Sequence, residues 1–180
     1  MIMICTRIYR RFLRSFKIRK FSKYGTMISF APWNSQFTYE NIELGSHIYI
    51  GDFADFIATR SKILIGNHVI FAPKVSIRGG DHRIDIVGRY IDTVTDDEKL
   101  PENDLDIVFV GDNWIGMNVT ILKGVTIGRG SVIGAGSVVT KSLPPYSICA
   151  GVPCQVIKKR FTEEQIIEHE LKLYGKVLTI

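Results

Sequence analysis

The sequence repeats itself every six residues over two stretches, roughly 42–80 and 107–145. Most of these hexads begin with an aliphatic residue, continue with Gly, Asn or Asp, and carry a small or β-branched residue four places on. A helix repeats every 3.6 residues and a strand every 2, so neither element alone explains the period. The hexads begin at Leu44, Ile50, Ile65, Phe71, Ile77, Ile115, Ile121, Ile127, Ile133 and Val139.

We interpret each hexad as one short strand followed by one corner, with the leading residue pointing inward. Glycine and asparagine tolerate the backbone angles that a tight corner requires. Three hexads then close a triangular coil of about eighteen residues, and stacked coils form parallel sheets with Ile and Val ladders inside. A helical array is excluded, because each glycine in 111–137 would cost about 1 kcal/mol in a helix.

The pattern divides the chain into three parts. Residues 1–40 are expected to form a basic helix and a lead-in, and residues 41–145 the β-helix, interrupted at 81–106 by a long, highly charged loop insertion. Residues 146–180 are expected to form an extended segment and a short C-terminal helix, which the capping box "TEEQ" at 162–165 opens. The fold class is mainly β.

Charge is concentrated at the N-terminus. Residues 1–39 hold eight Lys/Arg and no acid, whereas the remainder holds fifteen Lys/Arg against eighteen Asp/Glu. Because the basic excess belongs to one arm and no nucleic-acid-binding motif is present, we expect no nucleic acid partner. No apolar run approaches the ~20 residues that cross a bilayer, and the first residues do not fit a signal peptide. We therefore expect a cytoplasmic location.

The arm itself, residues 4–21, fits an amphipathic helix with one apolar stripe. Ile4, Ile8, Phe12 and Phe16 fall four residues apart, among basic side chains. One interpretation is peripheral contact with the acidic surface of the inner membrane. The other, which we expect, is that the stripe covers the open end of the repeat array.

The segments "NWIGMNVTILKGVTIGRGSVIGAGSVVTKSLPP" (113–145) and "AGVP" (150–153) resemble the hexapeptide-repeat acyltransferases with a left-handed parallel β-helix. Within that family the chain is most similar to the maltose, galactoside, and capsular or lipopolysaccharide sugar O-acetyltransferases. The resemblance implies a left-handed coil, a homotrimer, and acetyl-CoA bound in the cleft between neighbouring β-helices. It also implies direct acyl transfer, with a histidine as general base and no metal.

His82, in "GGDHRID", is the candidate catalytic base, because the family places its histidine after a coil and before an acceptor-binding loop. An imidazole that titrates near neutrality can take a hydroxyl proton and later protonate the departing CoA thiolate. Asp85 is a candidate for orienting the imidazole or binding a sugar hydroxyl, and equally for a solvated loop acid. Asp55 roughly aligns with the residue that grips the acceptor in galactoside-type relatives.

The resemblance assigns six further positions. Trp114 matches a tryptophan that lines the active site, where we expect it to contact both acceptor and cofactor. Met117 stands at a cofactor-site position where some relatives have a serine close to the oxyanion, so the backbone is expected to stabilise the oxyanion here. The other expected cofactor-binding residues are Ala135, beside the pantetheine arm, and Thr140, Lys141 and Lys158, near the CoA phosphates.

The sequence thus predicts an acetyl-CoA-dependent O-acetyltransferase whose acceptor is a small-molecule or lipid-linked sugar, a precursor of capsule, O-antigen or exopolysaccharide. One alternative is N-acetylation of an amino sugar, or acetylation of a xenobiotic. Less favoured alternatives are a zinc carbonic anhydrase-like enzyme and a non-catalytic β-helix scaffold. The zinc enzyme needs three histidines, and His47, His68 and His82 are spaced 21 and 14 residues apart, which does not match the closely spaced pair that it requires.

Overall fold

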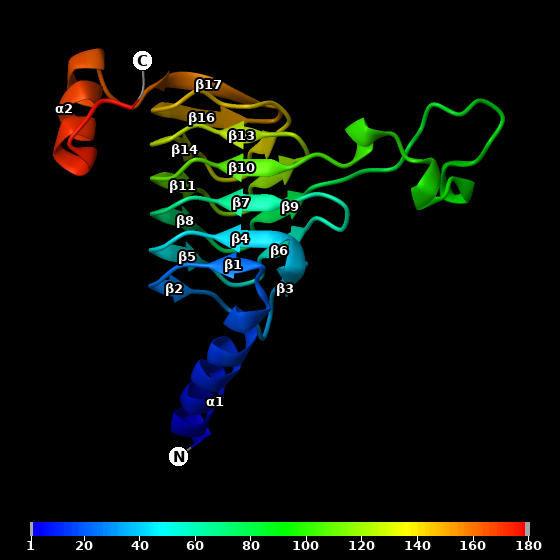
Figure 1. The fold of residues 1–180 in the computed structure, drawn as a ribbon, viewed down its shortest axis with the longest axis horizontal. Coiled ribbons are helices and arrows are strands. Elements are labelled where there is room, and N and C mark those ends of the chain that lie inside the picture. Colours follow the sequence, from blue (N-terminus) through cyan, green and yellow to red (C-terminus); the bar gives the residue numbers. More distant parts are fainter. Residues whose placement is uncertain (1, 179–180) are drawn as a thin grey trace.

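The chain folds into a triangular prism of stacked coils. The computed structural model describes residues 2–178, with the side chains of residues 8–178. Three sheets form the faces of the prism, and consecutive coils pair in parallel (Figure 1). The strand order is β1-β4-β7-β10-β13 in sheet A, β17-β16-β14-β11-β8-β5-β2 in sheet B, and β15-β12-β9-β6-β3 in sheet C.

The strands are short, as the hexads predict. Sheet A contains β1 (Lys23–Tyr24), β4 (Ile42–Leu44), β7 (Ile63–Ile65), β10 (Ile107–Phe109) and β13 (Thr126–Ile127). Sheet B contains β2 (Ile28–Ser29), β5 (Ile48–Ile50), β8 (Val69–Phe71), β11 (Asn113–Ile115), β14 (Val132–Ile133), β16 (Ser147–Gly151) and β17 (Cys154–Lys159). Sheet C contains β3 (Gln36–Phe37), β6 (Asp55–Ile57), β9 (Ser76–Arg78), β12 (Thr120–Leu122) and β15 (Val138–Val139).

The core is a set of ladders that run along the prism axis. In sheet B the leading hexad residues Ile50, Phe71 and Ile115 pair in register, and all three are buried. The ring of Phe71 lies 5.1 Å from that of Phe56 and 5.0 Å from that of Phe109, in edge-on contacts across the interior. The residue that starts each hexad therefore does point inward.

The β-helix begins earlier than residue 41, where the hexads start. Strands β1, β2 and β3 already form a complete first coil and pair with β4, β5 and β6. This coil escapes the repeat pattern because aromatic rings fill its interior in place of aliphatic hexad residues. Phe21 and Phe30 are buried there, with ring centroids 5.4 Å apart.

The first helix, α1 (Ile2–Lys17), continues into the short 3-10 helix η1 (Ile18–Lys20) and does not cover the core as expected. Its apolar residues Ile8, Phe12 and Phe16 are exposed, whereas the end of the core is closed by Phe21 together with Phe37 and neighbouring rings. The expectation was wrong because the first coil supplies its own aromatic cap. Ile4 lies outside the side chains that the structure describes.

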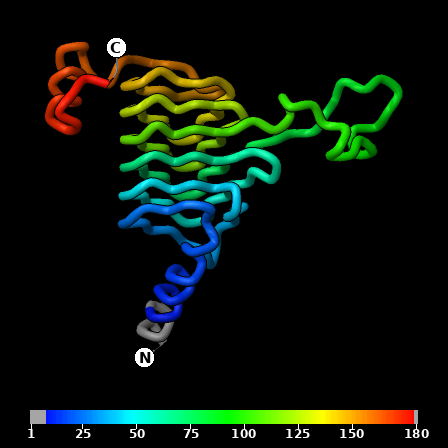
Figure 2. The backbone as a smooth tube through the Cα atoms, viewed as in Figure 1, coloured from blue at the N-terminus to red at the C-terminus, as the bar shows by residue number. Residues whose placement is uncertain are grey.

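The expected loop insertion lies between β9 and β10 and projects from the prism, as Figure 2 shows. It contains three single-turn 3-10 helices, η3 (Ile91–Thr93), η4 (Asp96–Glu98) and η5 (Pro101–Asn103). A further 3-10 helix, η2 (Tyr39–Asn41), precedes β4. After the last hexad, β16 pairs with β14 in parallel and β17 returns antiparallel to it, so the extended segment continues sheet B.

The C-terminal helix α2 (Glu163–Tyr174) has the predicted capping box, in which the Thr162 side chain accepts a hydrogen bond from the backbone N–H of Gln165. A buried polar contact fastens this helix to the prism: the hydroxyl of Tyr146 donates to Glu170 Oε1 over 3.1 Å. The carboxylate of Glu170 also accepts from the backbone N–H of Leu178. The helix therefore has a fixed position beside the last coils.

Candidate active site

His82 lies at the base of the long loop, four residues after β9 ends. The two strands of the loop base are held together there by Asp81 N–H donating to Asn103 O and by Leu105 N–H donating to Gly79 O. The Asn103 amide also donates to Asp81 Oδ1. The imidazole of His82 is exposed, on a backbone that these contacts fix.

A glycine is required where the loop leaves the coil. A Cβ atom at Gly80 would lie 2.0 Å from the carboxylate of Asp104, which belongs to the returning strand of the loop. The close approach of these two strands explains the "GG" that precedes Asp81 and His82. It also keeps the returning strand close to the base of the loop, where His82 lies.

A network of ion pairs shapes the loop. Arg83 Nε lies 2.7 Å from Asp85 Oδ1, and Arg89 Nη1 lies 2.5 Å from Glu98 Oε1. The hydrogen bond from Arg83 lowers the pKa of Asp85, and the pairing with Arg89, with help from Thr95, lowers the pKa of Glu98 to about 2. Asp85 is thus engaged with Arg83, and no hydrogen bond to the His82 imidazole is formed among the residues that the structure describes.

A cavity of about 150 Å³ opens beside His82, between sheet C and the loop base. Its walls carry charges of both signs on a small apolar floor, which suits a polar ligand with several hydroxyl groups. The lining residues are Ile57, Thr59, Arg78, Gly80, Asp81, His82, Lys99 and Asp104.

Arg78 and Asp55 form an ion pair at the edge of this cavity, from adjacent strands of sheet C. The guanidinium of Arg78 pairs with Asp55 Oδ2 and also donates to the Asp55 carbonyl over 3.3 Å. The second carboxylate oxygen, Asp55 Oδ1, is buried and has no hydrogen-bond partner. The structure therefore places the predicted acceptor-binding Asp55 against Arg78, a residue of the cavity wall, and leaves one carboxylate oxygen of Asp55 without a partner.

Arg78 and Lys99 were missed as cavity residues by sequence reasoning. Arg78 left a signal, because the second position of the hexads that start at Ile115, Ile127 and Ile133 is glycine, whereas "IRGGD" has arginine there. Lys99 left none. It reaches the cavity through loop folding, where its ammonium lies 3.7 Å from Asp104 and 3.1 Å from Asp96.

Trp114 lies on sheet B, in the centre of β11, with 56% of its surface exposed. It continues an outward row with Ile70 and Tyr49 on the strands below. In Figure 1, β11 lies at one edge of the prism, and the loop that carries His82 leaves from the other side. Trp114 does not line the cavity beside His82, so one protomer does not bring these two residues together.

The expected cofactor residues are exposed near the C-terminal end of the prism. Met117 and Ala135 occupy corners between sheets B and C, and Thr140 and Lys141 follow β15 at the next corner. Lys158 lies on β17. Successive corners stack closely here, because a Cβ atom at Gly116 would lie 2.6 Å from the backbone nitrogen of Ala135.

The remaining histidines lie elsewhere. His47 and His68 stack on each other at a corner between sheets A and B, with ring centroids 4.4 Å apart. His169 packs against Phe161 with its Nε2 atom 3.6 Å from Asp112, so it is half-buried. Among the side chains that the structure describes, those of residues 8–178, no three His, Cys, Asp or Glu are arranged to hold a metal ion.

Known proteins similar to this chain share one activity class. The family model described as bacterial transferase hexapeptide (six repeats) matches residues 111–141. A probable macrolide acetyltransferase from Lysinibacillus sphaericus is 41% identical over 146 residues, which are 75% of this chain and 74% of the relative. The galactoside O-acetyltransferase of Lactococcus lactis is 35% identical over 129 residues, 71% of this chain and 58% of its own length.

A solved structure agrees with these relatives. The hexapeptide-repeat acetyltransferase of Vibrio cholerae, crystallised with acetyl coenzyme A, superimposes with a TM-score of 0.71 at 28% identity. The match covers 82% of this chain and 76% of that one.

Proposed function

The chain belongs to the hexapeptide-repeat acetyltransferases, and from this premise we propose that it transfers the acetyl group of acetyl-CoA directly to a sugar hydroxyl. Membership makes the protein an acyltransferase with acetyl-CoA as co-substrate, and its β-helix a left-handed one. The finer parts of the proposal are the base, the acceptor and the assembly.

His82 acts as the general base. It removes the proton of the acceptor hydroxyl, whose oxygen attacks the thioester carbon, and the imidazolium then protonates the CoA thiolate as the C–S bond breaks. The observation that carries this role is the cavity beside His82, because it gives a hydroxyl-bearing ligand a place within reach of an exposed imidazole. Met117 offers no donor for the oxyanion, so backbone N–H groups supply that stabilisation.

The acceptor is held by the Asp55–Arg78 pair. Asp55 Oδ1 is buried without a partner, which is costly, while the Asp55 side chain as a whole is 34% exposed. A small rotation of the side chain would bring this oxygen to a sugar hydroxyl that donates to it. Arg78 fixes the other oxygen and so orients the carboxylate. A neutral, hydroxyl-rich acceptor suits the balanced charges of the cavity, and the acceptor that we propose is a sugar of capsule, O-antigen or exopolysaccharide biosynthesis.

The complete site requires a homotrimer. His82 and Trp114 lie on different sides of one protomer, so both line one site only if a second copy brings its sheet B to the loop of the first. Acetyl-CoA would lie in that groove, along Ala135, Thr140 and Lys141, with Lys158 near its phosphates. The proposal also includes cytoplasmic work, because acetyl-CoA is a cytoplasmic metabolite, with peripheral contact at the inner membrane if the acceptor is lipid-linked.

A second acceptor class is favoured by one observation. The relative from Lysinibacillus sphaericus, similar over three quarters of both chains, is named a probable macrolide acetyltransferase. The same base and donor would acetylate a drug hydroxyl or an amino sugar nitrogen.

A free-thiol assay with acetyl-CoA tests the proposal across nucleotide sugars, polyprenyl-linked glycans, simple sugars, amino sugars and macrolides. We expect CoA release with a sugar, and a loss of roughly 10²–10⁴-fold in His82→Ala. The matched control is His68→Ala, an exposed histidine far from the cavity, which should keep wild-type turnover. Turnover of His82→Ala close to that of His68→Ala would remove the base assignment, and turnover with macrolides alone would replace the sugar.

A further inference from the structure

Helix α1 contacts the rest of the protein through its basic side. The guanidinium carbons of Arg10 and Arg14 lie 4.7 and 5.6 Å from the ring centroid of Trp33, in the first coil. Arg14 Nε also donates to the carbonyl of Phe30 over 2.8 Å. A polar face turned toward the protein is the reverse of the usual arrangement, in which a surface helix buries its apolar stripe.

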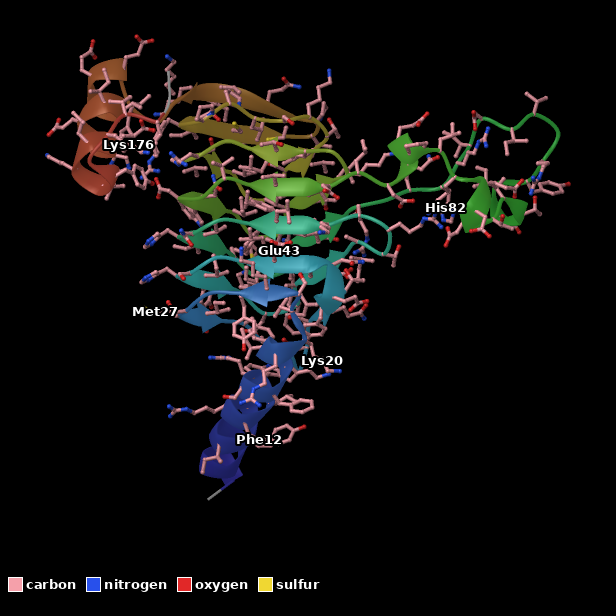
Figure 3. All side chains as sticks on the ribbon, in the orientation of Figure 1. Phe12, Lys20, Met27, Glu43, His82 and Lys176 are labelled. Atoms are coloured by element: carbon pink, nitrogen blue, oxygen red, sulfur yellow. The ribbon has the colours of Figure 1, made fainter. Side chains whose placement is uncertain are left out.

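The apolar side of α1 is consequently left in solvent. Ile8, Tyr9, Phe12 and Phe16 are 64%, 61%, 71% and 57% exposed. Residues 8, 12 and 16 are one helical turn apart and lie on one side, opposite to Arg10 and Arg14. Figure 3 shows Phe12 on the part of α1 that projects beyond the end of the prism. These four residues are called the α1 apolar face below.

The positive charge around the α1 apolar face indicates what kind of surface this face binds. All eight charged residues of segment 1–39 are basic, and the remainder of the chain carries a slight acidic excess. An amphipathic helix with aromatic and aliphatic residues on one side and Lys/Arg on the other fits an anionic lipid surface, where apolar side chains enter the headgroup boundary. No helix of the described residues is long and apolar enough to cross a membrane.

We infer that α1 is a peripheral membrane anchor, whose apolar face inserts at the surface of a bilayer that contains anionic lipid. The anionic lipid headgroups also attract the basic residues on the side of α1 that faces the prism. A helix is about 10 Å wide, and charges act over about 8–10 Å at physiological salt, so these residues lie within range of the lipid surface. A nucleic acid would engage the basic side, which the protein itself occupies. A second copy of α1 would bring together two segments of the same positive sign.

The test is flotation of the full-length protein with lipid vesicles, which is independent of catalysis. Vesicles of phosphatidylcholine alone are compared with vesicles that also contain phosphatidylglycerol, at low and at high salt. The test variant is Phe12→Ser with Phe16→Ser. The matched control is Ile167→Ser with Leu173→Ser, which removes two exposed apolar residues from α2. Sedimentation velocity without vesicles gives the association state of every variant.

We expect the wild type and the α2 variant to float with the anionic vesicles and to be released by salt. The α1 variant should bind at least tenfold more weakly with the same association state. Equal flotation of the α1 and α2 variants, equal binding to neutral vesicles, or no flotation of the wild type would overturn the inference. A lower association state in the α1 variant would also overturn it, by showing that a second copy covers the apolar face. Acetyl transfer to a soluble acceptor should stay unchanged in both variants, so a failed anchor is distinguishable from a failed enzyme assignment.

Discussion

Two inactive variants should restore activity to each other when they assemble together. His82→Ala removes the proposed base, and Trp114→Ala removes the exposed indole on sheet B. We expect each homogeneous variant to keep about 1% or less of wild-type turnover, because one loses proton transfer and the other loses positioning. The two residues lie on different sides of one protomer, so a shared site takes them from different copies.

The size of the recovery follows from counting sites. Each site in a ring needs His82 from one protomer and Trp114 from the next. In a random equal mixture each requirement is met with a chance of one half, so about a quarter of the sites are complete. Turnover should therefore rise to about a quarter of the wild-type value, far above either variant alone.

The assay is free-thiol release from the two variants after equal amounts of their subunits have been assembled at random, without selection of the mixed trimers. In a control, equal amounts of wild-type subunits and of the double variant His82→Ala/Trp114→Ala are assembled at random. It should give about a quarter of full activity if the site is shared, and about one half if each protomer holds a complete site. A mixture that stays as inactive as its components, with a control at one half, would refute the shared site.

Three other perturbations follow from the structure. Phe71→Ala should lower the free energy of unfolding by about 3–5 kcal/mol in a denaturant titration, because the ring is fully buried between two others, and a loss below about 1 kcal/mol would contradict that packing. Burial raises the pKa of Tyr39 to about 12, above the value of about 10 in the unfolded chain. The contribution of Tyr39 to the free energy of unfolding is therefore complete below about pH 10 and is lost as the pH rises toward about 12. Tyr39→Phe should make the free energy of unfolding fall less steeply with pH in this range. A fall identical to that of the wild type would contradict the burial of the Tyr39 hydroxyl. Lys141→Ala should raise the KM for acetyl-CoA by roughly three- to tenfold with little change in kcat, since it removes one exposed phosphate contact; an unchanged KM would exclude Lys141 from the cofactor site.

The period of six was enough to predict the prism, because each side of a triangular coil needs the same types of residue: an inward apolar residue and a corner residue. The burial of residues such as Phe71 and Ile115 is predicted by their position at the start of a hexad. The first coil was hidden, since Phe21, Phe30 and Phe37 fill it without the repeat. The orientation of α1 was hidden too, because a helical stripe shows which residues share a side and not which side meets the protein.

The candidate site was predicted in part for the same reason. His82 and Asp55 stand next to regular coils, so their places follow from the repeat. Lys99 reaches the cavity through the path of an irregular loop, which no local pattern encodes. The partner of Asp85 was likewise set by the loop, where Arg83 lies two residues away and takes the carboxylate.

The reversal of direction at β17 has a consequence for how two molecules can meet end to end. A stack of identical rungs has no inherent length, and its terminal rung is a template on which another chain can continue the ladder. On sheet B that template ends against a strand that runs the opposite way and has two exposed lysines, Lys158 and Lys159, at its C-terminal end. Growth of one molecule upon the next is thereby discouraged.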